Sequence, residues 1–133
     1  MSVPKSKRKQ SPYEYIVILQ QICIKTIEFN NNENKRIPLL SEKIAEKSLE
    51  TYCDATRYFE MTIGSIQGNL SEKKKFCKKT IYESRELSAL INIFIAERMK
   101  ENKSVNELVQ MTSELNKVVE LLVDELKHFS NLD

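Results

Sequence analysis

The sequence predicts an all-α fold, an antiparallel up-down-up-down four-helix bundle, from three observations. Glycine and proline together account for only five of the 133 residues, so turns are few and the elements between them are long. Apolar residues recur at steps of three and four, which is the period of an α-helix, and no segment alternates as a half-buried strand does. Links of a few residues then require consecutive helices to run antiparallel.

The first ten residues carry basic side chains and no periodic apolar residues, which predicts a disordered basic arm over 1–10 and a bundle over 11–133. No apolar run approaches the roughly 18 residues of a membrane span, and the basic start is not followed by a signal segment. Three cysteines without CxxC spacing indicate reduced thiols in a cytoplasmic protein, and we expect all three to be small buried apolar residues.

The first helix is predicted over 12–30. Ser11 is a good N-cap, Pro12 suits the first helical position, and Glu14 completes a capping box. A run rich in asparagine from Asn30 ends the helix, because asparagine side chains compete for backbone hydrogen bonds.

The second helix is predicted over 38–67, between Pro38 and a stop at Gly68. Its apolar residues form one stripe, which consists of Leu40, Ile44, Tyr52, Ala55, Phe59, Ile63 and Ile66. Tyr52, Tyr58 and Phe59 could also stack nucleic-acid bases, but their helical spacing favours a packing role.

Capping boxes at Asn69 and Ser104 predict a third helix over 70–100 and a fourth over 104–130. The inward residues expected on the third helix are Cys77, Ile81, Ser84, Ser88, Ile91 and Ile95. Those on the fourth are Leu108, Met111, Leu115, Val118, Leu122 and Phe129, with Glu125 as the one interruption.

The first helix is apolar round more of its circumference than a bundle helix needs. The surplus predicts burial against a second copy of the chain, although a wide core face would also account for it. The residues expected at this homo-oligomer interface are Tyr13, Val17, Ile18, Ile22, Ile24 and Phe29.

The sequence lacks residues that known catalytic and metal-binding sites require. His128 is the single histidine, so zinc sets, di-metal Glu-x-x-His pairs and serine triads are incomplete. With glycine only at positions 64 and 68, phosphate-cradling glycine loops are also excluded. We therefore expect no catalytic residues, no metal and no cofactor, and a protein that is not an enzyme.

Charge is segregated along the chain. Residues 69–100 hold eight basic and four acidic residues, whereas residues 101–133 hold three and seven. The basic side chains could be a solvated face or could pair with the acidic fourth helix. They could also contact RNA or DNA phosphates without reading sequence, since lysine is a point charge. The predicted nucleic-acid contacts are Lys5, Lys7, Arg8, Lys9, Lys74, Lys75, Lys78, Lys79 and Arg85.

The opening MSVPKSKRKQS, a capped first helix and the Arg36-Ile37-Pro38 entry to the second resemble small bacterial four-helix-bundle proteins related to the 23S rRNA intervening-sequence protein. The nearest branch looks like the accessory variability determinants of diversity-generating retroelements. The resemblance implies a non-enzymatic subunit that assembles into a ring, typically a pentamer, and binds nucleic acid and a reverse transcriptase. The arm match carries the basic extension of that family onto Lys5, Lys7, Arg8 and Lys9.

This chain has a formal net charge of only +2 and an acidic fourth helix, whereas the accessory subunits are strongly basic. An alternative therefore stays open: a protein-only scaffold or phage-associated interaction module that does not bind nucleic acid.

Overall fold

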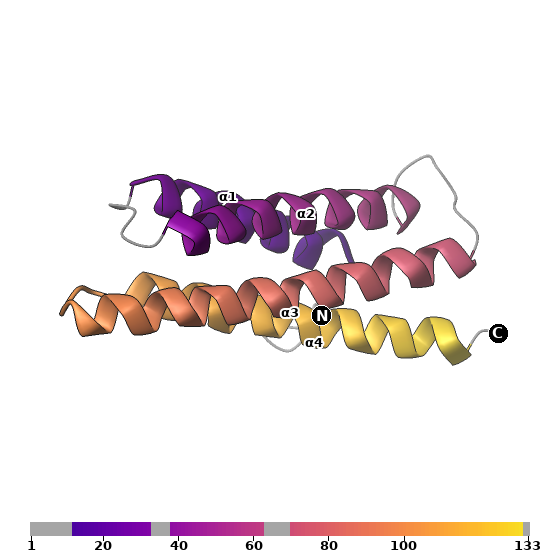
Figure 1. The fold of residues 1–133 in the computed structure, drawn as a ribbon. Helices are drawn as coiled ribbons and strands as arrows, with labels where there is room; N and C mark the ends of the chain where they lie inside the picture. The colour runs from indigo at the N-terminus through magenta and orange to yellow at the C-terminus, as the bar shows by residue number, and fades with distance from the viewer. Residues whose placement is uncertain (1–11, 33–37, 63–69, 132–133) are drawn as a thin grey trace.

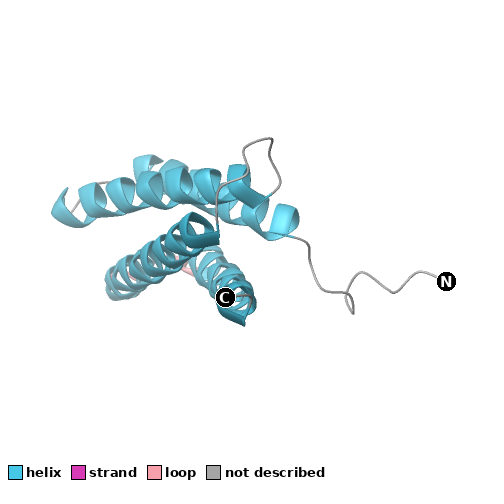
Figure 2. Ribbon diagram, turned by 90° about the vertical axis from the view of Figure 1, so that its right-hand side faces the viewer, coloured by secondary structure: helices cyan, strands magenta, loops and turns pink. Residues whose placement is uncertain are grey.

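The structure, a computed structural model, describes residues 12–32, 38–62 and 70–131. This part of the chain contains four helices and no strand: α1 (Pro12–Asn32), α2 (Pro38–Thr62), α3 (Leu70–Lys100) and α4 (Asn106–Asn131). Helices α1 and α2 form one layer, and α3 and α4 lie beneath them (Figure 1). Each helix packs on the next along the chain, and α1 also packs on α4, so the predicted up-down-up-down bundle is confirmed. Figure 2 shows the two layers from the end at which the chain finishes.

The helix boundaries follow the prediction with small differences. Helix α3 has the predicted bounds, and α1 continues two residues past Asn30. Helix α4 begins at Asn106 rather than at the predicted Ser104, and its first turn is closed by a hydrogen bond from Val109 N to Val105 O. The backbone oxygen of Ser104 instead accepts a bond of 2.8 Å from Arg98 Nε. The predicted arm over 1–10, the cap residues Ser11 and Asn69, and the stretch 63–68 lie outside the described residues.

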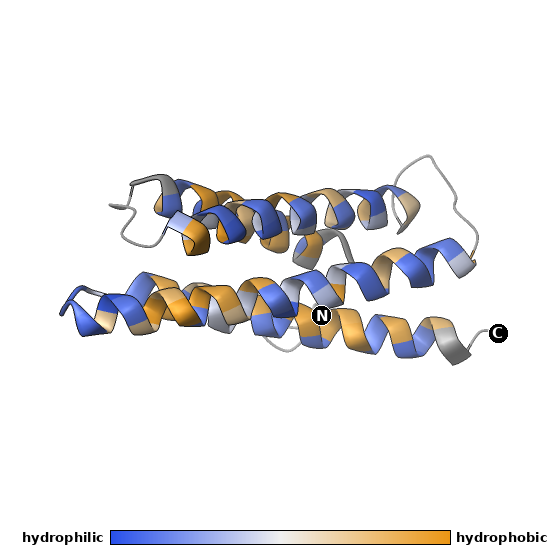
Figure 3. Ribbon diagram, viewed as in Figure 1, coloured by the Kyte–Doolittle hydropathy of each residue, from blue (hydrophilic) through white to orange (hydrophobic). Residues whose placement is uncertain are grey.

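The core lies between the layers, where the apolar stripes of the helices meet; hydrophilic and hydrophobic bands alternate along each ribbon in Figure 3. All six inward residues predicted for α4 are buried, and Glu125 is half-buried. Five of the six predicted for α3 are also buried, and Ile95 packs against the core. Tyr58 of α2 is only 1% exposed, and Tyr52 and Phe59 pack against the core, so these aromatic rings serve packing.

Helices α2 and α3, which pack on each other, both bury small side chains. Ser48, Thr51 and Ala55 of α2 and Ser84 of α3 have no exposed surface. The hydroxyl groups of Ser48 and Thr51 donate to backbone carbonyls one turn earlier in α2, at 2.7 Å each. These local bonds satisfy the buried hydroxyls of Ser48 and Thr51.

Polar contacts fix the end of the bundle at which α1 passes to α2 and α3 passes to α4. Asn30 Nδ2 donates to Ser41 O and Ser41 Oγ donates to Asn30 Oδ1, both at 3.0 Å, which ties the end of α1 to the start of α2. Asn102 adopts a left-handed conformation, with φ of 57°, in the link between α3 and α4. Asparagine is among the residues that tolerate this region, so the turn is closed without glycine.

No helix in the described ranges has both the length and the apolar character needed to cross a membrane.

Candidate nucleic-acid interface

The N-terminal half of α3 presents its basic side chains away from the core. Because Cys77, Ile81 and Ser84 face inward, residues on the opposite side of the helix point to solvent. Because an α-helix turns about 100° per residue, these basic side chains fall into two rows along α3. The first row is Lys74, Lys78 and Arg85, and the second row is Lys75 and Lys79; all are exposed except Lys74, which is half-buried.

Helix α2 adds a cation that the sequence analysis missed. The guanidinium carbon of Arg57 lies 5.6 Å from the centroid of the Phe76 ring. The ammonium groups of Lys75 and Lys79 each lie 5.8 Å from the same centroid. Three positive charges from two helices therefore gather round one half-buried ring, whose electron-rich faces attract cations. We call Arg57, Lys75, Phe76 and Lys79 the Phe76 cluster.

Five cations of this surface have no carboxylate partner in the part of the chain that the structure describes. None of Arg57, Lys75, Lys78, Lys79 and Arg85 forms an ion pair with any residue in the described ranges. Pairing with the acidic fourth helix, one of the alternatives for the basic residues of α3, is therefore not seen for these five. Gathering like charges without a counter-charge is unfavourable unless an anion is bound, so the surface is suited to an anionic ligand.

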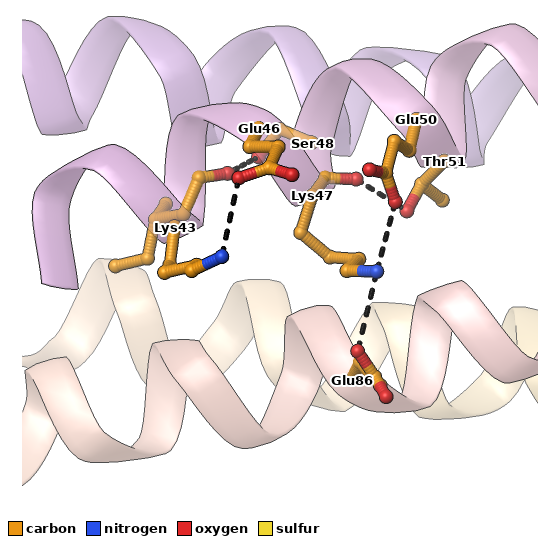
Figure 4. A network of polar contacts seen from close by, with 8 residues as sticks. Lys43, Glu46, Lys47, Ser48, Glu50, Thr51 and Glu86 are labelled. Atoms are coloured by element: carbon orange, nitrogen blue, oxygen red, sulfur yellow. Dashed lines mark hydrogen bonds and ion pairs between the residues drawn. The ribbon is translucent and has the colours of Figure 1, made fainter. Parts of the chain in front are cut away.

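One helical turn further along α3, the charges are paired instead. Lys47 of α2 forms ion pairs with Glu50 at 2.8 Å and with Glu86 of α3 at 3.2 Å (Figure 4). The hydrogen bond from Lys47 to Glu50 is the main reason that the pKa of Lys47 is raised above its ordinary value. The Tyr82 hydroxyl donates to Glu86, which raises the pKa of Tyr82 and lowers that of Glu86. This network links α2 to α3, and the single positive charge of Lys47 offsets part of the negative charge of Glu50 and Glu86.

A second pair of acids crosses the same helix contact. Burial, followed by the neighbouring carboxyl of Asp54, raises the pKa of Glu83 to about 7. The Oε2 atom of Glu83 is buried and has no hydrogen-bond partner within the described ranges. A carboxyl that keeps its proton near neutral pH can share it with Asp54, so this pair holds one negative charge where two would repel.

The cysteines differ from one another. Cys23 and Cys77 are fully buried, as expected, and burial raises the pKa of each thiol to about 12, so neither is a reactive thiolate. The expectation is wrong for Cys53, which is exposed because it lies on the outer side of α2. Among the described residues, no three or more His, Cys, Asp or Glu side chains are grouped so that they could hold a metal ion.

The residues predicted for self-association on α1 are mostly covered by the chain itself. The prediction is wrong for Ile22, which is 2% exposed within the core, since α1 packs on both α2 and α4. Ile18 and Phe29 pack against the core, and Phe29 makes an edge-on contact with Phe94. Val17 is half-buried and Ile24 is 44% exposed, so these two residues remain available to a partner.

The described residues include only part of the predicted nucleic-acid contacts. Lys74, Lys75, Lys78, Lys79 and Arg85 are brought onto one face, whereas Lys5, Lys7, Arg8 and Lys9, like the side chain of Tyr13, lie outside the described residues. Arg57 could not be found from sequence, because its place beside Phe76 depends on how α2 and α3 align.

In comparisons with known proteins, no family model, no curated protein and no solved structure matches the chain.

Proposed function

We propose that this chain is a non-enzymatic accessory subunit that binds the phosphates of RNA or DNA through the two basic rows of α3 and Arg57 of α2. The observation that carries the proposal is the Phe76 cluster, in which three cations share one ring and lack carboxylate partners in the described ranges. Lysine and arginine side chains of this kind contact phosphate oxygens and release bound counterions. Such binding is independent of sequence, because no geometry for reading base edges accompanies it.

The partner and the assembly follow from the resemblance of the sequence to retroelement accessory proteins. On this proposal the subunit forms a homo-oligomer, a pentamer in the family it resembles, and holds nucleic acid close to a reverse transcriptase. Repetition of one cationic surface round an oligomer would multiply weak contacts through a high effective concentration. Co-purification of the chain with a co-expressed retroelement reverse transcriptase tests the partner directly.

Salt dependence tests the phosphate contacts. About five cations on a single strand predict a fall in affinity of roughly 100-fold between about 50 mM and about 200 mM salt. Fluorescence anisotropy with a labelled single-stranded RNA measures this slope. Affinity that does not change with salt, or binding that is undetectable at about 50 mM salt, would overturn the proposal.

A charge-matched pair of variants locates the site. Lys78→Glu with Lys79→Glu removes two cations from the basic rows and should weaken RNA binding at least about tenfold while making the salt slope shallower. Lys117→Glu with Lys127→Glu makes the same change in net charge on exposed residues of α4. Equal losses in the two variants would mean that net charge alone, and not the α3 surface, governs binding.

The alternative function, a protein-only scaffold, is favoured by exposed apolar side chains away from the basic rows. Leu39 and Leu49 of α2 and Met99 of α3 are each more than half exposed. Isolated exposed apolar residues are common on ordinary surfaces, so they support this alternative less strongly than the unpaired cations support nucleic-acid binding.

A further inference from the structure

Tyr82 of α3 is an aromatic side chain directed into solvent within the basic surface. It is 62% exposed, it does not pack against the core, and its ring contacts no other aromatic ring in the described ranges. An exposed tyrosine ring offers a flat apolar face on which a planar ligand can pack.

The position of Tyr82 on the helix relates it to the phosphate contacts. With about 100° turned per residue, Tyr82 lies about 80° round α3 from Lys74. The first row, through Lys78 and Arg85, covers about 0–40° on the same scale, and the second row, through Lys79, covers about 100–140°. The ring therefore lies between the two rows, one helical turn beyond Lys78 and Lys79.

The hydroxyl group of Tyr82 lies near the carboxylate of Glu86, one turn further along α3. Glu86 is paired with Lys47 of α2 at 3.2 Å. This ion pair reduces the repulsion that Glu86 would exert on a phosphate. The ring thus lies beside cations that have no carboxylate partner in the described part of the chain.

We propose that this surface binds single-stranded nucleic acid, with a base stacked on Tyr82 and the flanking phosphates on Lys78, Lys79 and Arg85. This inference rests on the proposed function and names its ligand class. An aromatic ring beside a positively charged track is the arrangement with which proteins hold single strands, because every base offers a flat face. In a duplex the bases are already stacked on one another, so the ring would gain nothing.

The first experiment compares affinities by fluorescence anisotropy. Tyr82→Ala should weaken binding of a mixed-sequence single-stranded RNA of about 20 nucleotides by about 5- to 100-fold. Binding of the corresponding duplex should change by less than about twofold, and the salt slope for the single strand should be unchanged, since no charge is lost. Tyr82→Phe keeps the ring and should bind the single strand within about threefold of the natural chain. Ile93→Ala, on the same outward side of α3 but beyond the lysines, is the control.

The second experiment uses fluorescence. The chain contains no tryptophan, so Tyr82→Trp introduces a single indole whose emission should be quenched when a base stacks on it. Ile93→Trp places the single indole elsewhere on α3, where saturating RNA should leave its emission unchanged.

The outcomes separate this inference from the proposed function. An unchanged affinity in Tyr82→Ala, or an indole that is not quenched in Tyr82→Trp, overturns stacking while the loss of binding in Lys78→Glu with Lys79→Glu still supports phosphate binding. If neither the lysine variant nor Tyr82→Ala changes affinity, the proposed function fails together with the inference.

Discussion

Two glutamates three residues apart on α3 have opposite electrostatic surroundings. Glu86 accepts hydrogen bonds from Tyr82 and Lys47, which lower its pKa. Glu83 is desolvated and lies beside Asp54, and its pKa rises to about 7. A glutamate side chain is therefore anionic at position 86, whereas at position 83, on the neighbouring turn of α3, it keeps its proton to a higher pH.

The raised pKa of Glu83 predicts how stability depends on pH. The folded state holds this proton more tightly than the unfolded chain, so the associated stability is present in acid and is lost as pH rises through about 7. Glu83→Gln keeps the position neutral, and we expect it to match the natural chain at pH 5 and to exceed its free energy of unfolding by about 1 kcal/mol at pH 8, allowing for solvent screening. Urea denaturation at both pH values measures the difference.

Glu86→Gln is the matched control for this prediction. Glu86 is already ionised throughout this pH range, so its replacement should cause a small loss of stability that does not vary between pH 5 and pH 8. The interpretation of Glu83 would be contradicted if Glu83→Gln showed the same dependence on pH as the natural chain.

At the scale of elements, both α2 and α3 bury small side chains in the core of the bundle. Ser84 is fully buried and its Oγ has no hydrogen-bond partner among the described residues. Removing an unsatisfied buried hydroxyl relieves its desolvation cost, so Ser84→Ala should leave the free energy of unfolding unchanged or raise it by up to about 1 kcal/mol. Ser84→Leu should lower it by about 1 to 3 kcal/mol, because the added volume forces the two helices apart. Thermal and urea unfolding measure both variants.

A loss of more than about 1 kcal/mol in Ser84→Ala would contradict this view, since it would show that the hydroxyl is bonded in the folded protein. Thr51→Val provides a comparison on the facing helix. The Thr51 hydroxyl donates to Lys47 O at 2.7 Å, so here the substitution removes a formed bond without changing the volume of the side chain.

How far the sequence predicts the elements depends on which interactions define them. The stripe of α4 is strictly periodic, and every inward residue predicted for it is buried. Contacts between helices have no comparable pattern in the sequence. Two such pairs, Lys47 with Glu86 and Arg57 with Phe76, become neighbours only when α2 and α3 pack together. Tyr82 has a signal in the sequence, a position off the inward stripe and one turn from two lysines, but an exposed ring is recognised only once burial is known.

At the scale of the molecule, the covering of α1 changes the prediction of self-association. Contacts with α2 and α4 bury Ile16, Leu19 and Ile22, so most of its apolar circumference belongs to the core of one chain. Val17 and Ile24 remain, and together with Tyr52 of α2 they form the apolar part of a shallow hollow that Gln20, Gln21 and Lys25 also line. An apolar strip of this size supports a weaker association than a whole uncovered helix face would.

The remaining strip still allows a sharp test of assembly. If copies of the chain meet there, Ile24→Lys places a charge in the contact and should raise the dissociation constant at least about tenfold, with little effect on folding because the side chain is 44% exposed. Ile93→Lys makes the same change at a residue 51% exposed on α3 and should leave assembly unaltered. Sedimentation velocity at micromolar concentration follows both variants. A natural chain that sediments as a monomer under these conditions would remove self-association, and with it the multiplication of the cationic surface; equal effects of the two lysines would move the contact away from α1.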